Sequence, residues 1–162
     1  MHWLPAYVGL GSNLSDPPAR LRAALAALAD LPGTRLVLQS GQWGSKPFGP
    51  VAQPDFCNAV AALLTQLEPE PLLAELRALE SRLGREPPRE RWGPRVIDLD
   101  LLAVGTRRVA TPELMLPHPG LAERAFVLFP WREVAAGFEV PGLGSVDSLA
   151  ARLPAAAAWR LR

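Results

Sequence analysis

The sequence contains very few of the residues that build disulfides or zinc sites. Its single cysteine, Cys57, excludes an intrachain disulfide framework and any multi-cysteine metal site. Only two histidines are present, His2 and His118, which argues against a histidine-based zinc site. The chain therefore offers neither a disulfide scaffold nor a zinc scaffold.

Long apolar runs and a strong net charge are missing too. No stretch of about 18 apolar residues is present that could span a bilayer, and residues 1–5 lack the basic region of a secretory signal. The formal net charge is +1, from 17 basic and 16 acidic residues, so no global field recruits nucleic acid or an anionic membrane. We expect a cytoplasmic protein with no membrane partner and no nucleic-acid partner.

The standard phosphate-binding and nucleophile motifs are absent as well. The chain has no Gly-x-x-x-x-Gly-Lys-Ser/Thr loop, and its one lysine, Lys46, precedes a proline. The glycine-rich run at 9–13 lacks the third glycine of a dinucleotide fingerprint, so we interpret it mainly as a tight turn. No Gly-x-Ser-x-Gly elbow occurs. Candidate chemistry must come from other residues.

The overall composition is that of an ordinary globular protein. Of the 162 residues, 49% are hydrophobic and 20% are charged. This length fits one domain and leaves little room for a second. We expect a single domain over residues 1–162, acting as a monomer.

Hydrophobic periodicity predicts strands and helices in an alternating order. Strands are expected at 5–10, 35–39, 56–64 and 96–104, with a hairpin partner at 109–110. One helix should follow an N-cap at Ser15 and Asp16, and a second should cover 69–83 and stop at Gly84. Loops are expected at 44–54 and 85–94, and residues 121–134 should be mostly helical with an interruption at Pro130.

This order of elements favours one fold class. Two helices between four strands suit an α+β ferredoxin-like sandwich, in which helices pack on an antiparallel sheet. A doubly wound sheet would need more helices. We therefore predict the ferredoxin-like sandwich, followed by a short tail of mixed structure.

Asp98 and Asp100 are the sharpest chemical feature. Residues two apart in a strand face the same side, so both carboxylates should project together while Ile97, Leu99 and Leu101 enter the core. Two like charges so close repel unless a cation compensates them, and Mg²⁺ prefers oxygen ligands, often one or two carboxylates plus substrate phosphates. The spacing is equally compatible with a solvent-facing strand whose acids pair with arginines.

An arginine-rich loop precedes this strand. It spans Arg85 to Arg95 and ends in the sequence RWGPR at 91–95. The guanidinium group is a planar fork that matches phosphate oxygens, although most charge runs are simply solvated. Because the arginines lie next to two carboxylates, phosphate binding is favoured. The alternative from another class is a ferredoxin-like RNA-binding module that uses the Arg85–Arg95 loop.

Phe56 and Asn58 share a face at the start of the strand at 56–64. An aromatic ring beside an amide that offers both a donor and an acceptor suits a flat heterocycle, although Phe56 alone is more simply a core residue. His118, between two prolines, is compatible with a structural loop residue, and Cys57, on the opposite face from Asn58, with a small core residue.

Taken together, these segments resemble a known enzyme family. The motifs are GSNL at 11–14, GP at 49–50 with QPDFCN at 53–58, RWGPRVIDLD at 91–100, PH at 117–118 and RAFVL at 124–128. In this order and spacing they resemble 6-hydroxymethyl-7,8-dihydropterin pyrophosphokinase, an enzyme of folate synthesis. The resemblance runs from about residue 7 to residue 141, and its most specific part is the segment at 91–100.

The resemblance implies transfer of pyrophosphate from ATP to the pterin hydroxymethyl oxygen, with release of AMP. It implies that Asp98 and Asp100 hold two Mg²⁺ ions that bridge the phosphates of ATP, the co-substrate. Further roles that it implies cover phosphate contact and loop closure (Arg85, Arg91, Trp92 and Arg95), the nucleotide side (His118 and Arg124), and the pterin side (Ser45, Phe48, Phe56, Asn58 and Phe126).

The chain departs from the family pattern at two positions. Phe56 stands where the family often has tyrosine, so a hydroxyl contact is lost while ring stacking survives. A second loop arginine of the best-known members falls on Pro87, and Arg89 lies two residues further on. The closing of the loop is therefore expected to differ more from the family than the metal site does.

Overall fold

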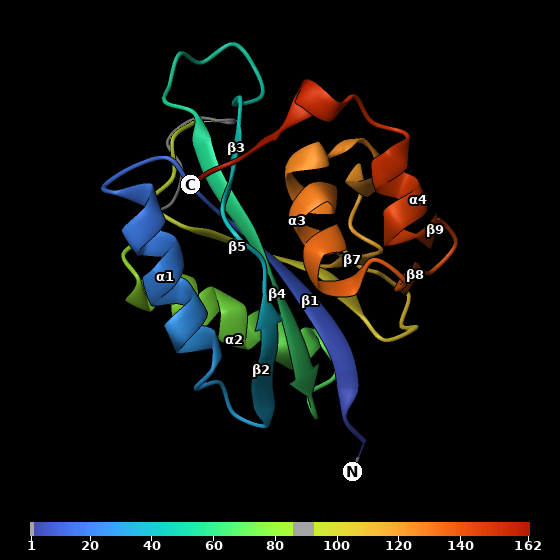
Figure 1. Cartoon of the computed structure of the whole chain (residues 1–162). Coiled ribbons are helices and arrows are strands. Elements are labelled where there is room, and N and C mark those ends of the chain that lie inside the picture. Colours follow the sequence, from blue (N-terminus) through green and yellow to red (C-terminus); the bar gives the residue numbers. More distant parts are fainter. Residues whose placement is uncertain (1, 86–92) are drawn as a thin grey trace.

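The structure is a computed structural model that describes residues 2–85 and 93–162 (Figure 1). The first part of the chain forms β1 (Leu4–Ser12), α1 (Pro17–Leu28), β2 (Thr34–Gln39), β3 (Trp43–Ser45), β4 (Phe56–Thr65), α2 (Pro69–Arg82) and β5 (Asp98–Val104). The second part forms β6 (Val109–Ala110), β7 (Met115–Leu116), α3 (Ala125–Ala135), β8 (Glu139–Val140), β9 (Gly144–Ser145), α4 (Val146–Ala151) and β10 (Trp159–Arg160). Short 3₁₀ turns cover Leu121–Glu123 and Ala155–Ala157.

The main sheet is antiparallel throughout. β1 lies between β4 and β5, while β2 and β3 pair one after the other with the outer edge of β4. The resulting order β2–β4–β1–β5, with α1 after the first of these strands in the chain and α2 before the last, is that of a ferredoxin-like sandwich. The predicted fold class is confirmed.

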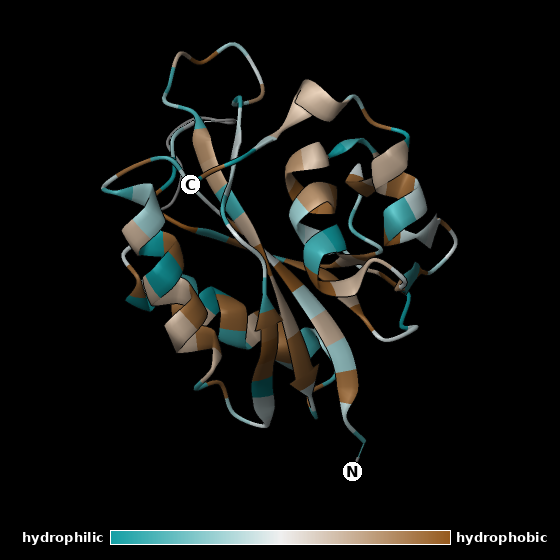
Figure 2. Cartoon of the chain, in the orientation of Figure 1, coloured by the Kyte–Doolittle hydropathy of each residue, from teal (hydrophilic) through white to brown (hydrophobic). Residues whose placement is uncertain are grey.

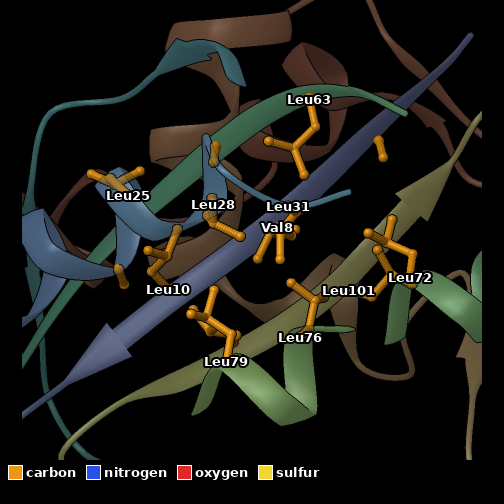
Figure 3. Close-up of a cluster of buried hydrophobic side chains, with 14 of the residues drawn as sticks. Val8, Leu10, Leu25, Leu28, Leu31, Leu63, Leu72, Leu76, Leu79 and Leu101 are labelled. Atoms are coloured by element: carbon orange, nitrogen blue, oxygen red, sulfur yellow. The ribbon is translucent and has the colours of Figure 1, made fainter. Parts of the chain in front are cut away.

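Helices α1 and α2 cover one face of this sheet (Figure 1). Both helices alternate hydrophilic and hydrophobic residues (Figure 2), as expected for helices with one buried side. Their leucines recur at spacings of three and four and meet the inward side chains of the strands (Figure 3). The buried residues labelled there are Val8, Leu10, Leu25, Leu28, Leu31, Leu63, Leu72, Leu76, Leu79 and Leu101.

The opposite face carries a second helical layer, formed by α3 and α4 (Figure 1). The helix expected within 121–134 is confirmed as α3. The segment is more than a short tail, however, because it buries a second core that includes Phe129 and Trp131. The predicted interruption at Pro130 was wrong, because α3 runs through Pro130. The non-helical residue of this segment is Arg124, between the 3₁₀ turn and the first turn of α3. Proline removes one helix hydrogen bond, and the burial of its neighbours offsets that loss.

Other element boundaries differ in detail. Asp16 holds the N-cap position of α1 but makes no side-chain capping bond, because it adopts a left-handed conformation with φ 64°. β5 begins at Asp98 rather than at 96, and the predicted loop at 44–54 starts inside β3. Gly84 follows α2 with φ 94°, a conformation that glycine adopts without strain, so its predicted role as the helix stop is confirmed. No helix within residues 2–85 and 93–162 has the length and apolarity to cross a membrane.

Candidate active site

A cavity of about 290 Å³ opens between the sheet and the start of α3. Its walls come from β1, β3, β4, β5 and the segments that lead into β5 and α3. The side chains come from the sheet face that α3 and α4 cover, because β4 and β5 alternate with a period of two. The lining includes Gly9, Gly11, Ser45, Lys46, Phe48, Phe56, Asn58, Gly93, Arg95, Asp98, Asp100, His118, Arg124 and Phe126.

The structure brings together most of the site residues expected from the sequence. Arg85 lines an adjoining hollow that shares Arg95, Asp98 and Asp100 with the cavity. Arg91 and Trp92 lie outside the described residues.

Asp98 and Asp100 lie on the same face of β5, as predicted, while Ile97, Leu99 and Leu101 are buried on the other. Asp98 is paired on both oxygens: Arg85 Nη1 donates to Oδ1 at 2.7 Å, and Arg95 Nη1 donates to Oδ2 at 3.2 Å. The expected arginine compensation is therefore real, but it falls on one carboxylate only.

Asp100 has no such compensation. No residue in the described part of the chain donates a hydrogen bond to its carboxylate. Burial, and then the negative charge of Asp98, raise the pKa of Asp100 to about 7, against the opposing effect of the Arg124 and Arg77 charges. An unpaired carboxylate beside a paired one is a donor set that a hard divalent cation can use.

Glu80 is a site residue that the sequence analysis missed. It is buried on α2 and accepts hydrogen bonds from Arg77 Nη1, Arg85 Nη1 and the backbone N–H of Leu99 on β5. Burial alone would lower the pKa of the Arg85 guanidinium, but the carboxylates of Asp98 and Glu80 raise it. Glu80 thus fixes the guanidinium of Arg85 against β5.

The sequence did contain a signal for Glu80. The residue lies four positions after Leu76 and eight after Leu72, on the stripe of α2 that faces the core. A carboxylate in an apolar stripe is costly to bury unless it is paired, so its position pointed to buried basic partners.

Asn13 holds the segment that leads into β5. Its Oδ1 accepts the backbone N–H of Arg95 at 2.9 Å, and its own N–H donates to the Arg95 carbonyl at 3.1 Å. Its Nδ2 donates to Gln53 Oε1 and to the Pro54 carbonyl. The prediction of a tight turn at 9–13 was wrong, because β1 continues to Ser12 and pairs there with β4 and β5. Asn13, which follows β1, joins Arg95 to the loop before β4.

In the Asn58 amide, the nitrogen is hydrogen-bonded within the protein, and the oxygen is available to a ligand. Its Nδ2 donates to the Trp43 carbonyl at 3.1 Å and to Ser45 Oγ at 2.9 Å. Within residues 2–85 and 93–162 no group donates to its Oδ1, which faces the cavity near Gly11, where a Cβ would come within 3.4 Å of it. The bound half fixes the orientation of the amide, so the cavity is offered an acceptor.

Three phenylalanines surround this amide. Phe56 precedes it by two residues on the same face of β4, and Phe126 projects from the first turn of α3. Phe48 is exposed and meets Phe126 edge-on, with ring centroids 5.5 Å apart. Aromatic walls around an oriented acceptor suit a flat heterocycle with donors along one edge.

His118 and Arg124 line the cavity on the α3 side of Asp100. His118 Nδ1 lies 2.8 Å from the Pro119 carbonyl and donates to it. Burial, and then the positive charge of Arg124, lower the pKa of His118. The imidazole is therefore neutral at pH 7 and keeps Nε2 as an acceptor.

Comparison with known proteins gives a consistent result. The profile of the family described as 7,8-dihydro-6-hydroxymethylpterin-pyrophosphokinase matches residues 7–136. A Pseudomonas aeruginosa protein named 2-amino-4-hydroxy-6-hydroxymethyldihydropteridine pyrophosphokinase is 45% identical over 149 residues, 91% of each chain. A Haemophilus influenzae protein of the same name is 44% identical over 146 residues, covering 90% of this chain and 91% of that one.

A solved structure shares the fold. The wild-type HPPK-DHPS of Plasmodium falciparum, crystallised with pteroate, superposes with a TM-score of 0.74 at 10% identity. The match covers 93% of this chain and 44% of that longer one. From the profile match and the relatives of near-equal length, the chain belongs to the 7,8-dihydro-6-hydroxymethylpterin-pyrophosphokinase family.

Proposed function

We propose that the cavity between the sheet and α3 is where this chain carries out the reaction of its family. The chain is an ATP-dependent pyrophosphokinase that converts 6-hydroxymethyl-7,8-dihydropterin to its pyrophosphate ester in folate synthesis. One observation carries the assignment of the site: an oriented amide acceptor with aromatic neighbours shares a single cavity with a carboxylate pair and Arg95.

The pterin is assigned to the end of the cavity at Asn58. The 2-amino group and the N3–H of a pterin are donors on one edge, and the open Oδ1 of Asn58 is the matching acceptor. Phe56 and Phe126 would stack on the two faces of the ring, with Ser45 and Phe48 at its edge. Phe56 supplies stacking without the hydroxyl of a tyrosine.

The phosphates of ATP are assigned to the end at Asp98 and Asp100. Arg95 Nε is buried and has no hydrogen-bond partner in the part of the chain that the structure describes, which leaves a cationic donor for a phosphate oxygen. Arg85, fixed by Glu80, lies on the other side of Asp98. Both arginines therefore lie where the negative charge of the transferred group would be.

Asp98 and Asp100 fit the Mg²⁺ that a phosphoryl-transfer enzyme uses. Two carboxylates on one face leave the remaining ligand positions to phosphate oxygens and water, which is the way that Mg²⁺ is commonly held. We infer two ions bound by this pair, both with ATP. When bound, Mg²⁺ neutralises charge on the phosphates and favours departure of AMP.

The reaction itself requires mainly positioning. The hydroxymethyl oxygen of the pterin attacks the β-phosphorus of ATP, and the bond from this phosphorus to the oxygen of the α-phosphate breaks as AMP leaves. Such transfers are loose and spread charge over the phosphate oxygens, so they depend on alignment and neutralisation more than on a strong base. His118 and Arg124 are assigned to the nucleotide side, with Nε2 of His118 as an acceptor for a nucleoside donor. Arg91 and Trp92 are assigned to closure of the site.

Several further expectations are part of this proposal. We infer a single domain over residues 1–162 that acts as a monomer in the cytoplasm, without a nucleic acid. The RNA-binding alternative, with the Arg85–Arg95 loop as its surface, has no support in the relatives of this chain. Two arginines of that segment, Arg85 and Arg95, are paired with Asp98 rather than turned toward a solvent-facing surface.

A coupled assay of purified protein tests the proposed function. Incubation with ATP, Mg²⁺ and 6-hydroxymethyl-7,8-dihydropterin should release AMP in equal amount to a pyrophosphorylated pterin. Omission of the pterin is the control and should leave ATP intact. Release of ADP with a monophosphorylated pterin would contradict the assigned reaction, and release of AMP without pterin would contradict the assigned acceptor.

A further inference from the structure

We propose that Glu133, Trp159 and Arg160 are positioning residues for the pterin subsite, although none of them lines the cavity. We call these three residues the edge clamp. The clamp holds β3, which orients Asn58 through two hydrogen bonds. This inference rests on the proposed function, because it concerns affinity for the pterin.

The first observation is the pairing of β3. This strand has only three residues, and both of its edges are occupied, by β4 on one side and by β10 on the other. Trp159 pairs with Gly44 and Arg160 with Trp43, and the N–H of Leu161 donates to the Gln42 carbonyl at 2.8 Å. A strand this short depends on pairing at both edges for a defined position.

The second observation is the set of contacts of Glu133, on α3. Its Oε1 accepts from the Gly41 N–H at 3.0 Å and from the indole Nε1 of Trp43 at 3.1 Å, and its Oε2 pairs with Arg160 Nη1 at 3.2 Å. One carboxylate therefore joins the segment just before β3, the first side chain of β3, and β10. Two of these contacts are made directly with the β3 segment.

The third observation is that two glycines make room for the clamp. A Cβ at Gly41 would overlap the guanidinium of Arg160, and a Cβ at Gly44 would overlap the indole of Trp159. Neither glycine has a positive φ, so backbone conformation does not require glycine there. These two positions are glycine because β10 approaches too closely to leave room for a side chain.

The link from the clamp to the cavity runs through backbone and hydroxyl acceptors of β3. The Trp43 carbonyl and Ser45 Oγ hold the Nδ2 of Asn58, which leaves Oδ1 directed at the cavity. If β3 shifts, both acceptors shift with it, and the amide is free to rotate. Among the described residues, no hydrogen bond or ion pair joins Asp98 or Arg95 to β3, so the affinity of the subsite assigned to ATP should not change.

Gly44→Ala tests this link from the far side of the sheet. Gly44 pairs with Cys57, whose side chain is in the core under α1 and α2, whereas Trp43 and Ser45 pair with Asn58 and Phe56 of the cavity. The added methyl group therefore displaces Trp159 without entering the cavity. Gly137→Ala is the matched control, because nothing lies within 4 Å of a Cβ there and its φ is not positive.

The experiment measures dissociation constants for the pterin and for MgATP separately, by calorimetry, together with the melting temperature. Gly44→Ala and Trp159→Ala should each weaken pterin binding about three- to tenfold, the range for one net hydrogen bond. The double variant should bind the pterin no more weakly than the single variant with the lower affinity, because both changes remove the same contact. Arg160→Ala should weaken it similarly, and Arg160→Lys, which keeps a cation opposite Glu133, should restore part of the affinity. MgATP binding should stay at the wild-type value in all of them.

Unchanged pterin affinity in Trp159→Ala and Arg160→Ala would overturn the proposal, and so would an equal loss of affinity for both ligands, which indicates general loosening of the fold. Should Gly44→Ala fail to fold, Trp159→Ala still decides, because it leaves β3 itself unaltered. Failure of the proposed function is distinguishable: in that case the wild-type protein itself binds no pterin.

Discussion

Replacement of Asp100 by asparagine should stabilise the protein without metal, and more so as the pH rises. In the folded state the pKa of Asp100 is raised from 3.8 to about 7 by burial and by the charge of Asp98. Between these two pH values the folded protein holds a proton that the unfolded chain releases, so stability falls as the pH rises through this window. Above pH 7 the loss is complete and constant.

The size of the effect follows from the shift. A shift of about three pH units, at about 1.4 kcal/mol each, corresponds to about 4 kcal/mol for an uncompensated charge. At pH 5 part of this loss is already present, so the wild type should lose about 2–3 kcal/mol more between pH 5 and pH 8. Asparagine has a similar shape and does not titrate, so this dependence should disappear.

Urea denaturation in the presence of a chelator measures this directly. The gain in unfolding free energy of Asp100→Asn over the wild type should increase by about 2–3 kcal/mol from pH 5 to pH 8. Asp98→Asn is the matched control, and it should instead destabilise by about 1–3 kcal/mol, because it removes the negative charge that Arg85 and Arg95 share. A gain that is the same at both pH values, or equal gains in both variants, would refute the reasoning.

Three more predictions test individual side chains. Asn58→Ala should cost about 1–3 kcal/mol of pterin affinity by calorimetry, since the donors of the pterin lose their acceptor, and it should leave ATP affinity unchanged; equal pterin affinity would contradict the assignment. Arg95→Ala should slow single-turnover chemistry by about 10³-fold, far more than Arg89→Ala does. A larger effect of Arg89→Ala would indicate that Arg89, rather than Arg95, contacts the transferred phosphates. Glu80→Ala should lower the unfolding free energy by about 3 kcal/mol, because two arginines and a buried backbone N–H lose a shared acceptor. A loss under about 1 kcal/mol, the size expected for an exposed ion pair, would contradict a structural role for Glu80.

Features that depend on local periodicity could be predicted from the sequence. The leucines of α2 at spacings of three and four gave the helix and its buried side, and period-two alternation placed Asp98 with Asp100 and Asn58 with Phe56. These predictions hold because burial of one face constrains every second or every third to fourth residue. The same rule placed Cys57 in the core, where burial raises its pKa to about 11.

Features that depend on contacts between distant segments could not be predicted in this way. Asn13 bonds Arg95 across 82 positions, and Glu80 bonds Leu99 across 19. A helix was expected where α3 lies, but its continuity was missed because Pro130 suggests a break when its buried neighbours are not known. β10 has only two residues, too few for any periodicity, and only its pairing with β3 defines it.

The most direct test of the central claim measures product formation and pterin binding in the same Asp100→Asn preparation. If Asp100 serves catalysis and Asn58 serves recognition, this variant binds 6-hydroxymethyl-7,8-dihydropterin with wild-type affinity by calorimetry but releases no AMP at saturating ATP and Mg²⁺, while the wild type forms AMP and pyrophosphorylated pterin in equal amounts. AMP release near the wild-type rate from the folded variant would contradict the claim that this carboxylate pair serves the transfer.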